Sequence, residues 1–245
     1  MPLRPVQKRR EDVFFVVILL AILAVNFIGF ARSYFLAGML RAHLPNLWVH
    51  LHAVIFTSWL LLLTAQIGLV AVGRVRWHRK LGWLGAVIAM LMLVIGPIAL
   101  VGAERRHAFL SVAESSVVLV GDVMALVLFG IFVLSGILRR SDTAVHKRLM
   151  LFATIAILPP GLSRWEFDFM RSDVMFYGIY LAFPFAVIIL DLFLRRRPYA
   201  ATLLGATVLT CFILSISPIS KLPQVRAILR RIQGPTVATV PASPR

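Results

Sequence analysis

The chain has 245 residues, of which 60% are hydrophobic and 15% are charged, and its mean hydropathy is +0.90. A soluble domain with that balance would expose large apolar patches, so the composition excludes an ordinary soluble protein. The net charge of +16 comes from short clusters of Lys and Arg between apolar runs. Such clusters are typical of membrane-topology signals, and they argue against a nucleic-acid-binding surface.

Runs of about 20 apolar residues, long enough to cross a bilayer core as a helix, recur along the whole chain. We predict seven spans, at residues 13–31, 48–73, 81–103, 114–138, 149–163, 174–194 and 199–218. The segments do not alternate as barrel strands do, and lipid tolerates no unpaired backbone groups, so every span is expected to be a helix. The expected fold is an all-α, polytopic integral membrane protein with an antiparallel four-helix core made by helices two to five.

Three regions are expected along the chain: a basic N-terminus (1–12), a single transmembrane domain (13–220) and a basic tail (221–245). The first apolar run has no clear small-residue cleavage site, so we interpret it as an uncleaved helix. The tail closes with "GPTVATVPASPR", a composition that is typical of disorder. We therefore expect the tail to be disordered.

Lys and Arg are distributed unequally between alternate loops. Fifteen lie in the set of loops that includes the N-terminus, and six lie in the opposite set. The positive-inside rule then makes the N-terminus cytoplasmic, and the expected location is the bacterial inner membrane. With seven spans the tail lies outside despite its own basic residues. Either the last span is not a crossing or the earlier loops dominate, and we favour seven crossings.

Two histidines stand at the outer end of the second span, in "WVHLHAVIFTSW". Helical spacing puts His52 on one face with Trp59 and Gln66, whereas His50 lies roughly opposite. Trp and Gln in mid-span favour a protein interior over lipid. We therefore expect His52 to face inward.

Further polar residues are expected at the same depth as His52. His107 and Glu114 precede or open the fourth helix, Asp122 lies within it, and Arg164 closes the fifth span. A lone Asp in the outer leaflet needs a partner, and Arg164 or a histidine could serve.

The inner side carries its own pair of histidines. His78, in "RWHRKLGW", precedes the third helix, and His146, in "AVHKRLML", precedes the fifth. Histidines thus fall at matching depths on alternate helices. Two neutral imidazoles facing each other across a helical core are the axial ligands that a six-coordinate haem iron needs.

The pairing of helices two with four and three with five resembles the transmembrane di-haem b-type cytochromes of the ascorbate-dependent ferric-reductase kind, over about residues 48–165. The segments "HLHAVIFTSWLLLLTAQ … WHRKLGWLGA … HKRLMLFATIAILPPGLSRW" also resemble an uncharacterised family of bacterial multi-pass membrane proteins. The cytochrome resemblance implies that His52, His107, His78 and His146 are axial ligands of haem b. It also implies electron transfer between a quinone or cytoplasmic donor and an outer acceptor, with a respiratory-chain component as partner.

Two interpretations from other classes stay open. One is a metal site near the outer face, for catalysis or metal delivery, built from His50, His52, Glu114 and Asp122, with Glu166 as a further candidate. Mixed nitrogen and oxygen ligands suit zinc, iron, manganese or copper(II).

The other open interpretation is a cofactor-free partner subunit or small transporter. In that case Asp122 and Arg164 form a structural polar pair, and His78 and His146 are headgroup-level residues. No phosphate-binding loop, Ser-His-Asp triad or zinc-protease motif occurs in the sequence, and the single Cys211 excludes an intrachain disulfide. The lipid bilayer is the expected partner, and nucleic acid is not.

Overall fold

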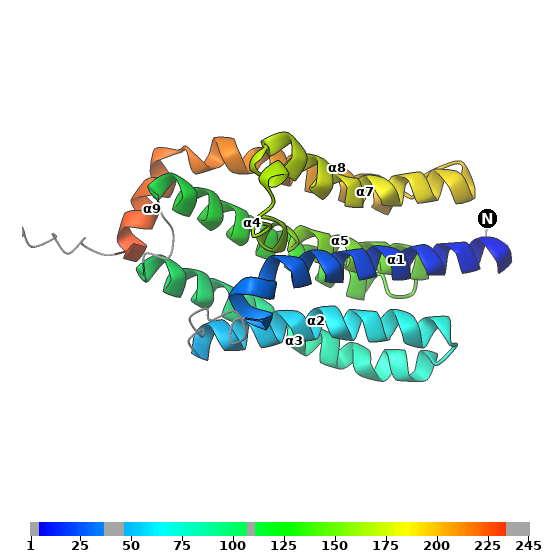
Figure 1. Cartoon of the computed structure of the whole chain (residues 1–245). Coiled ribbons are helices and arrows are strands. Elements are labelled where there is room, and N and C mark those ends of the chain that lie inside the picture. The colour runs from blue at the N-terminus through cyan, green and yellow to red at the C-terminus, as the bar shows by residue number, and fades with distance from the viewer. Residues whose placement is uncertain (1–4, 37–46, 107–110, 234–245) are drawn as a thin grey trace, which may run out of the picture.

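The computed structural model describes residues 5–36, 47–106 and 111–233 and contains only helices and their connections in these ranges (Figure 1). Six helices are long and apolar enough to cross a membrane: α1 (Pro5–Phe30), α2 (Leu47–Ala71), α3 (Val75–Arg105), α4 (Val112–Leu138), α7 (Asp173–Arg195) and α8 (Ala200–Ser220). The shorter elements are α5 (Thr143–Ala156), α6 (Pro159–Leu162), α9 (Pro223–Gln233), a π-helical turn (Ala31–Phe35) and a 3-10 turn (Asp168–Arg171).

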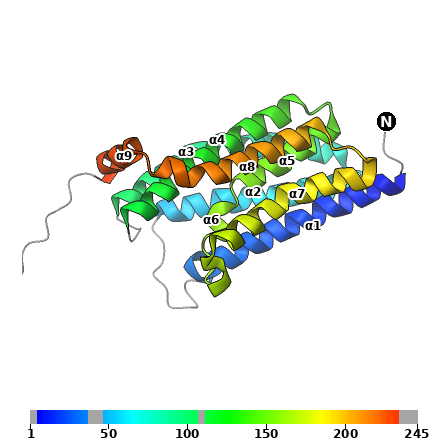
Figure 2. The same ribbon diagram turned by 90° about the horizontal axis from the view of Figure 1, so that it is seen from above.

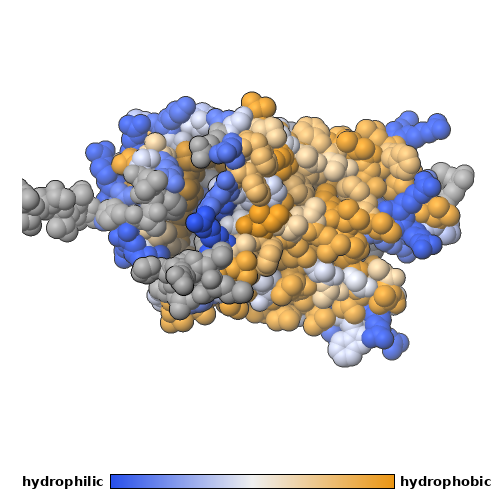
Figure 3. All heavy atoms as spheres, viewed as in Figure 1, coloured by the Kyte–Doolittle hydropathy of each residue, from blue (hydrophilic) through white to orange (hydrophobic). Residues whose placement is uncertain are grey.

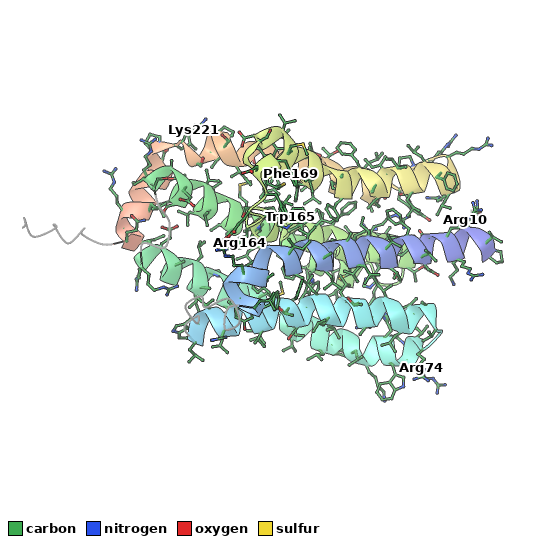
Figure 4. The ribbon with its side chains drawn as sticks, in the orientation of Figure 1. Arg10, Arg74, Arg164, Trp165, Phe169 and Lys221 are labelled. Carbon is green, nitrogen blue, oxygen red and sulfur yellow. The ribbon has the colours of Figure 1, made fainter. Side chains whose placement is uncertain are left out.

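The long helices run roughly along one direction, and the surface between their ends is apolar (Figures 1 and 3). The start of α1 and the turns α2–α3, α4–α5 and α7–α8 gather at one end of the bundle (Figure 1). We call this the basic end, and Arg10 and Arg74 mark it in Figure 4. The other end, where α1 and α8 finish, is called the opposite end. An apolar belt between two polar ends is the surface that a bilayer requires.

Six of the expected spans correspond to the six long helices, although α1 begins earlier than predicted and includes the basic residues before the apolar run. The fifth expected span differs, because it is divided into α5 and α6. α5 ends at Ala156, and α6 begins with Pro159 and Pro160. Proline has no backbone N–H to donate within a helix, so it is accommodated in a first turn and interrupts a longer helix. α5 has 14 residues and a length of about 21 Å, too short to cross a bilayer core unaided.

α5 is the most enclosed element of the bundle. It packs on α4, α7 and α8, and Phe152, Ala153, Ile155 and Ala156 on it have no exposed surface. α2 and α3 form a hairpin at the side of the bundle (Figures 1 and 2), and Trp59, Leu60 and Gln66 are the buried residues of α2. α5 is therefore enclosed mainly by α4, α7 and α8, and the four-helix core expected from helices two to five is not confirmed. A short helix with a buried arginine is stable only where several helices surround it.

Two glycines allow backbones to meet at close range. A Cβ at Gly29 of α1 would overlap the backbone of Gly161 in α6, and a Cβ at Gly205 of α8 would overlap the ring of Phe152. Small residues at such crossings let membrane helices approach closely. These contacts hold α6 against α1 and α8 against α5.

The tail begins with an ordered helix, which corrects the expected disorder from residue 221. α9 buries Val225 and Leu229 against α3, α4 and α8 and exposes its arginines. The Nε2 of Gln233 donates a hydrogen bond to Oε2 of the buried Glu104 at 3.0 Å. The apolar residues of the tail lie at helical spacing, and one packed face is enough to order a short amphipathic helix. Residues 234–245 lie outside the described ranges.

Candidate functional site

The two inner histidines lie in the first turns of α3 and α5, which both begin at the basic end. Asp142 is the N-cap of α5, and its side chain accepts hydrogen bonds from the backbone amides of Ala144 and Val145, both at 3.1 Å. An N-cap fixes where a helix begins, and it therefore sets the direction in which the next residues point. The rings of His78 and His146 face each other with centroids 6.3 Å apart and planes at 86°.

Each of these imidazoles is oriented by a backbone group. The Nδ1 of His146 lies 2.8 Å from the carbonyl oxygen of Gly136. A carbonyl only accepts, so this Nδ1 carries the proton and Nε2 keeps a lone pair. In the other ring, Nδ1 of His78 is buried without a partner among the described residues, and the imidazole interacts with the backbone of Gln66. A histidine that binds a metal through one ring nitrogen usually donates a hydrogen bond from the other. In both histidines one nitrogen is therefore available to a metal while the ring is held through a backbone contact.

The separation of the rings matches two imidazoles on one metal ion. A metal–nitrogen bond is about 2 Å long and the ring centre lies about 1 Å behind the nitrogen, so two ligands on opposite sides have centroids about 6 Å apart. Within the described ranges, no three His, Cys, Asp or Glu side chains lie close enough to hold one metal ion. A structural zinc ion needs four protein ligands, whereas a haem iron needs only two axial ones because the porphyrin supplies the rest. His78 and His146 would supply two nitrogen ligands to a bound metal group, which is the number that a haem iron takes from the protein.

The surroundings of this pair contain small residues. Gly82 and Gly85 follow His78 at helical spacing, and a Cβ at Gly82 would meet only the Nε2 of Gln66, at 3.9 Å. α3 packs along α2 and α4, but within the described residues it does not pack along α5. The two histidines therefore approach each other across the boundary between the α2–α3 hairpin and the rest of the bundle.

The predicted outer residues are distributed differently. His50 is exposed, and its Nδ1 lies 3.2 Å from the hydroxyl of Tyr34. His52 is partly buried and stacks on Phe56 with centroids 4.1 Å apart, and its Nδ1 has no partner among the described residues. Trp59, further along the face of His52, is buried as the helical spacing predicts. His107 lies outside the described residues.

Arg164 interacts electrostatically with both His52 and Asp122. In the described part of the chain, however, no direct ion pair joins Arg164 to Asp122. The guanidinium donates to the carbonyl of Pro160 and lies 4.6 Å from the ring centre of Phe30, near the end of α1 (Figure 4). Asp122 and Arg164 therefore interact electrostatically without the direct ion pair that the sequence predicts.

The structure does not gather the predicted outer metal ligands into one group. Glu114 is exposed, and its backbone amide donates to the Ser111 hydroxyl that caps α4. Glu166 pairs instead with Arg32 at the surface. The set His50, His52, Glu114 and Asp122 thus offers no cluster of three metal ligands.

A buried charge cluster near the basic end is absent from the sequence-based predictions. Arg148 of α5 and Asp191 of α7 are both fully buried and form an ion pair. Arg148 also donates to Oε1 of Glu11 in α1 at 2.8 Å and to the hydroxyl of Thr202 in α8 at 3.1 Å. Its guanidinium stacks 4.0 Å from the ring centre of Tyr199. Four helices therefore meet at one arginine.

Two sequence signals could have identified this cluster. Asp191 lies inside the predicted span 174–194, where an acidic residue requires a partner. Arg148 directly precedes the shortest predicted span, residues 149–163. If so short a span is buried, the charge of Arg148 is buried with it. Lys147, its neighbour, pairs with Glu11 and lies 3.9 Å from Asp12.

No protein-family model, curated protein or solved structure matches the chain.

Proposed function

We propose that the chain is a multi-pass membrane protein that binds haem b at its basic end and serves in electron transfer. The observation that carries the proposal is the proximity of the His78 and His146 rings, whose centroids lie 6.3 Å apart, together with the buried, unpartnered Nδ1 of His78 and the contact of the His146 Nδ1 with the Gly136 carbonyl. A haem held by two imidazoles supplies one-electron oxidation and reduction.

The protein's own residues hold and orient the two ligands. The Gly136 carbonyl fixes the proton of His146 on Nδ1, and the Asp142 cap fixes the first turn that carries this histidine. The backbone of Gln66 interacts with the His78 imidazole, and a Cβ at Gly82, one helical turn later, would meet only the Nε2 of Gln66. Outer hydrogen bonds of this kind set the orientation and basicity of a ligating imidazole.

The proposed topology has seven crossings with the N-terminus in the cytoplasm. Arg148 at the start of α5 contacts Glu11, and Gly161 in α6 meets Gly29, so α5 and α6 together run alongside 18 residues of α1. At 1.5 Å per residue this is about 27 Å, close to the thickness of a bilayer core. The excess of Lys and Arg at the basic end supports a cytoplasmic location for that end and a bacterial inner membrane as the site. A quinone or another respiratory-chain component is the electron-exchange partner that we expect.

The second haem that the cytochrome resemblance implies, on His52 and His107, stays a prediction. The unpartnered Nδ1 of His52 supports a ligand role for this residue. The haem-to-protein ratio separates one bound haem from two.

The test is a reduced-minus-oxidised absorption spectrum of the detergent-purified protein, expressed with adequate haem. We expect a b-type spectrum that His78→Ala and His146→Ala each abolish or shift. His50→Ala is the matched control, because His50 is exposed at the opposite end and should leave the spectrum unchanged. A wild-type protein without a Soret band would refute the proposal, and stoichiometric metal without such a band would favour a bare metal site.

A second pair of variants tests the site without removing a ligand. Gly82→Leu places a side chain beside His78, whereas Gly68→Leu on α2 enters open space, because no atom lies within 4 Å of the point that its Cβ would occupy. We expect lower haem occupancy for Gly82→Leu alone, with both variants eluting as monodisperse protein. Equal haem content in the two variants would argue against a site at this position.

A further inference from the structure

A groove with a volume of about 550 Å³ lies between α1 and α2 at the basic end. The α1 side carries Lys8, Arg9 and Asp12 and then Val13, Val16 and Val17, and Ala71 at the end of α2 closes the other side. The volume is within the range of about 300–1,000 Å³ that ligand sites occupy. Because the helix rises 1.5 Å per residue, the lining changes from charged to apolar over about 14 Å along α1.

We propose that this groove binds one anionic phospholipid, with its phosphate at Lys8 and Arg9 and an acyl chain along the valines. The groove opens where the apolar belt meets the basic end, which is the depth of lipid headgroups. The order of charged and apolar residues along α1 matches the order of headgroup and chain in a phospholipid. Basic pockets between membrane helices on the cytoplasmic side bind such headgroups.

The electrostatics of the groove favour an anion despite its one carboxylate. Lys8 and Arg9 are both exposed, and within the described residues neither forms an ion pair within hydrogen-bonding range. Asp12 is the one carboxylate in the lining, against the two cations Lys8 and Arg9, and it lies 3.9 Å from Lys147. The basic side chains therefore dominate the groove mouth, and each such residue near an anionic lipid strengthens attachment about fivefold.

The apolar part of the groove selects a lipid over a small anion. Val13 and Val17 are 56% and 58% exposed, so their side chains are available to an acyl chain. A free phosphate would use only the charged rim. An acyl chain, by contrast, gains about 0.8 kcal/mol per buried methylene, or about fourfold in affinity.

The experiment is native mass spectrometry of the delipidated full-length protein in neutral detergent, titrated with phosphatidylglycerol or phosphatidylcholine. We expect one phosphatidylglycerol to bind more tightly than phosphatidylcholine. Lys8→Gln with Arg9→Gln should weaken that binding about 25-fold, whereas Arg196→Gln with Arg197→Gln should not, although both residues are exposed and lie at the same end. Equal weakening by the two double variants would overturn the site, because it would indicate general charge attraction.

A third variant pair tests the apolar groove with every charge retained. Val13→Trp fills the apolar part of the groove. Leu20→Trp adds the same side chain at an exposed position of α1 outside the groove. Only Val13→Trp should reduce phosphatidylglycerol binding. If glycerophosphate displaces the lipid, or if Val13→Trp binds as the wild type does, the ligand is a free phosphate group and the lipid site is wrong.

Discussion

Removal of Asp191 should destabilise the protein more than any other single change near the basic end. Its carboxylate accepts hydrogen bonds from the Arg148 guanidinium, the Thr202 hydroxyl and the backbone amide of Tyr199. Asp191→Ala removes the acceptor of the Thr202 hydroxyl and the Tyr199 amide and one of the acceptors of Arg148, beside an arginine that is fully buried. The arginine keeps only Glu11 as a charged partner.

The magnitude follows from the cost of an uncompensated buried charge. Breaking a buried ion pair by removing one partner costs about 3–5 kcal/mol. We therefore expect Asp191→Ala to lower the free energy of unfolding by about 4 kcal/mol. Asp191→Asn keeps one carbonyl acceptor, so we expect about half that loss. Arg148→Met combined with Asp191→Leu should cost less than Asp191→Ala, because it removes both fully buried charges and the remaining buried carboxylate, Glu11, keeps Lys147 as its partner.

The measurement is reversible unfolding in mixed detergent micelles, followed by circular dichroism. Asp12→Asn is the control, because Asp12 is partly exposed and lies 3.9 Å from Lys147, so its loss should cost less than about 1 kcal/mol. If Asp191→Ala costs no more than Asp12→Asn, Arg148 does not depend on a buried partner and the reasoning fails.

Three further predictions concern packing and surface charge. Gly29→Ala should lower the free energy of unfolding by about 2 kcal/mol or more, because its Cβ overlaps backbone, whereas Gly68→Ala should be neutral or stabilising in the same unfolding assay. Trp59→Phe removes the donor to Thr154 Oγ1, 3.2 Å away, and should cost about 1 kcal/mol; no change in the unfolding midpoint would contradict this. Glu166→Gln removes an exposed ion pair, so the midpoint should move little, and any shift should vanish at high salt.

Much of the architecture could be predicted from single residues and their spacing. The apolar runs predicted the six long helices, because burying a helix in lipid depends mainly on the composition of about 20 consecutive residues. The spacing in α2 placed Trp59 and Gln66 on one inward face, and both are buried, whereas His50, placed roughly opposite, is exposed. The proximity of His78 and His146 also followed from their matching depths on helices three and five.

The remaining features depend on contacts between distant segments. Arg148 is one of the fifteen basic residues that the sequence places in loops, because nothing in its immediate neighbours indicates that Asp191 and Glu11 come from other helices to contact it. The helix α9 in the tail depends similarly on a distant contact, because Gln233 at its end donates a hydrogen bond to Glu104, which lies 129 residues earlier in the sequence. A polar residue is stable in the bundle only if a partner is near, and local sequence does not specify that partner.

The sequence by itself therefore determined a helical membrane protein, its six long apolar helices and the placement of His78 and His146 at the same end of the bundle. Hydropathy and helical periodicity depend only on residues that are close together in the sequence, so they can be evaluated without knowing which helices pack together. Only the tertiary structure decided that α5 is the central element, that the inner histidines face each other at 6.3 Å, and that the predicted outer metal ligands stay apart. Those outcomes depend on which helices pack together, and lipid-facing and protein-facing apolar surfaces are too alike in composition to reveal it.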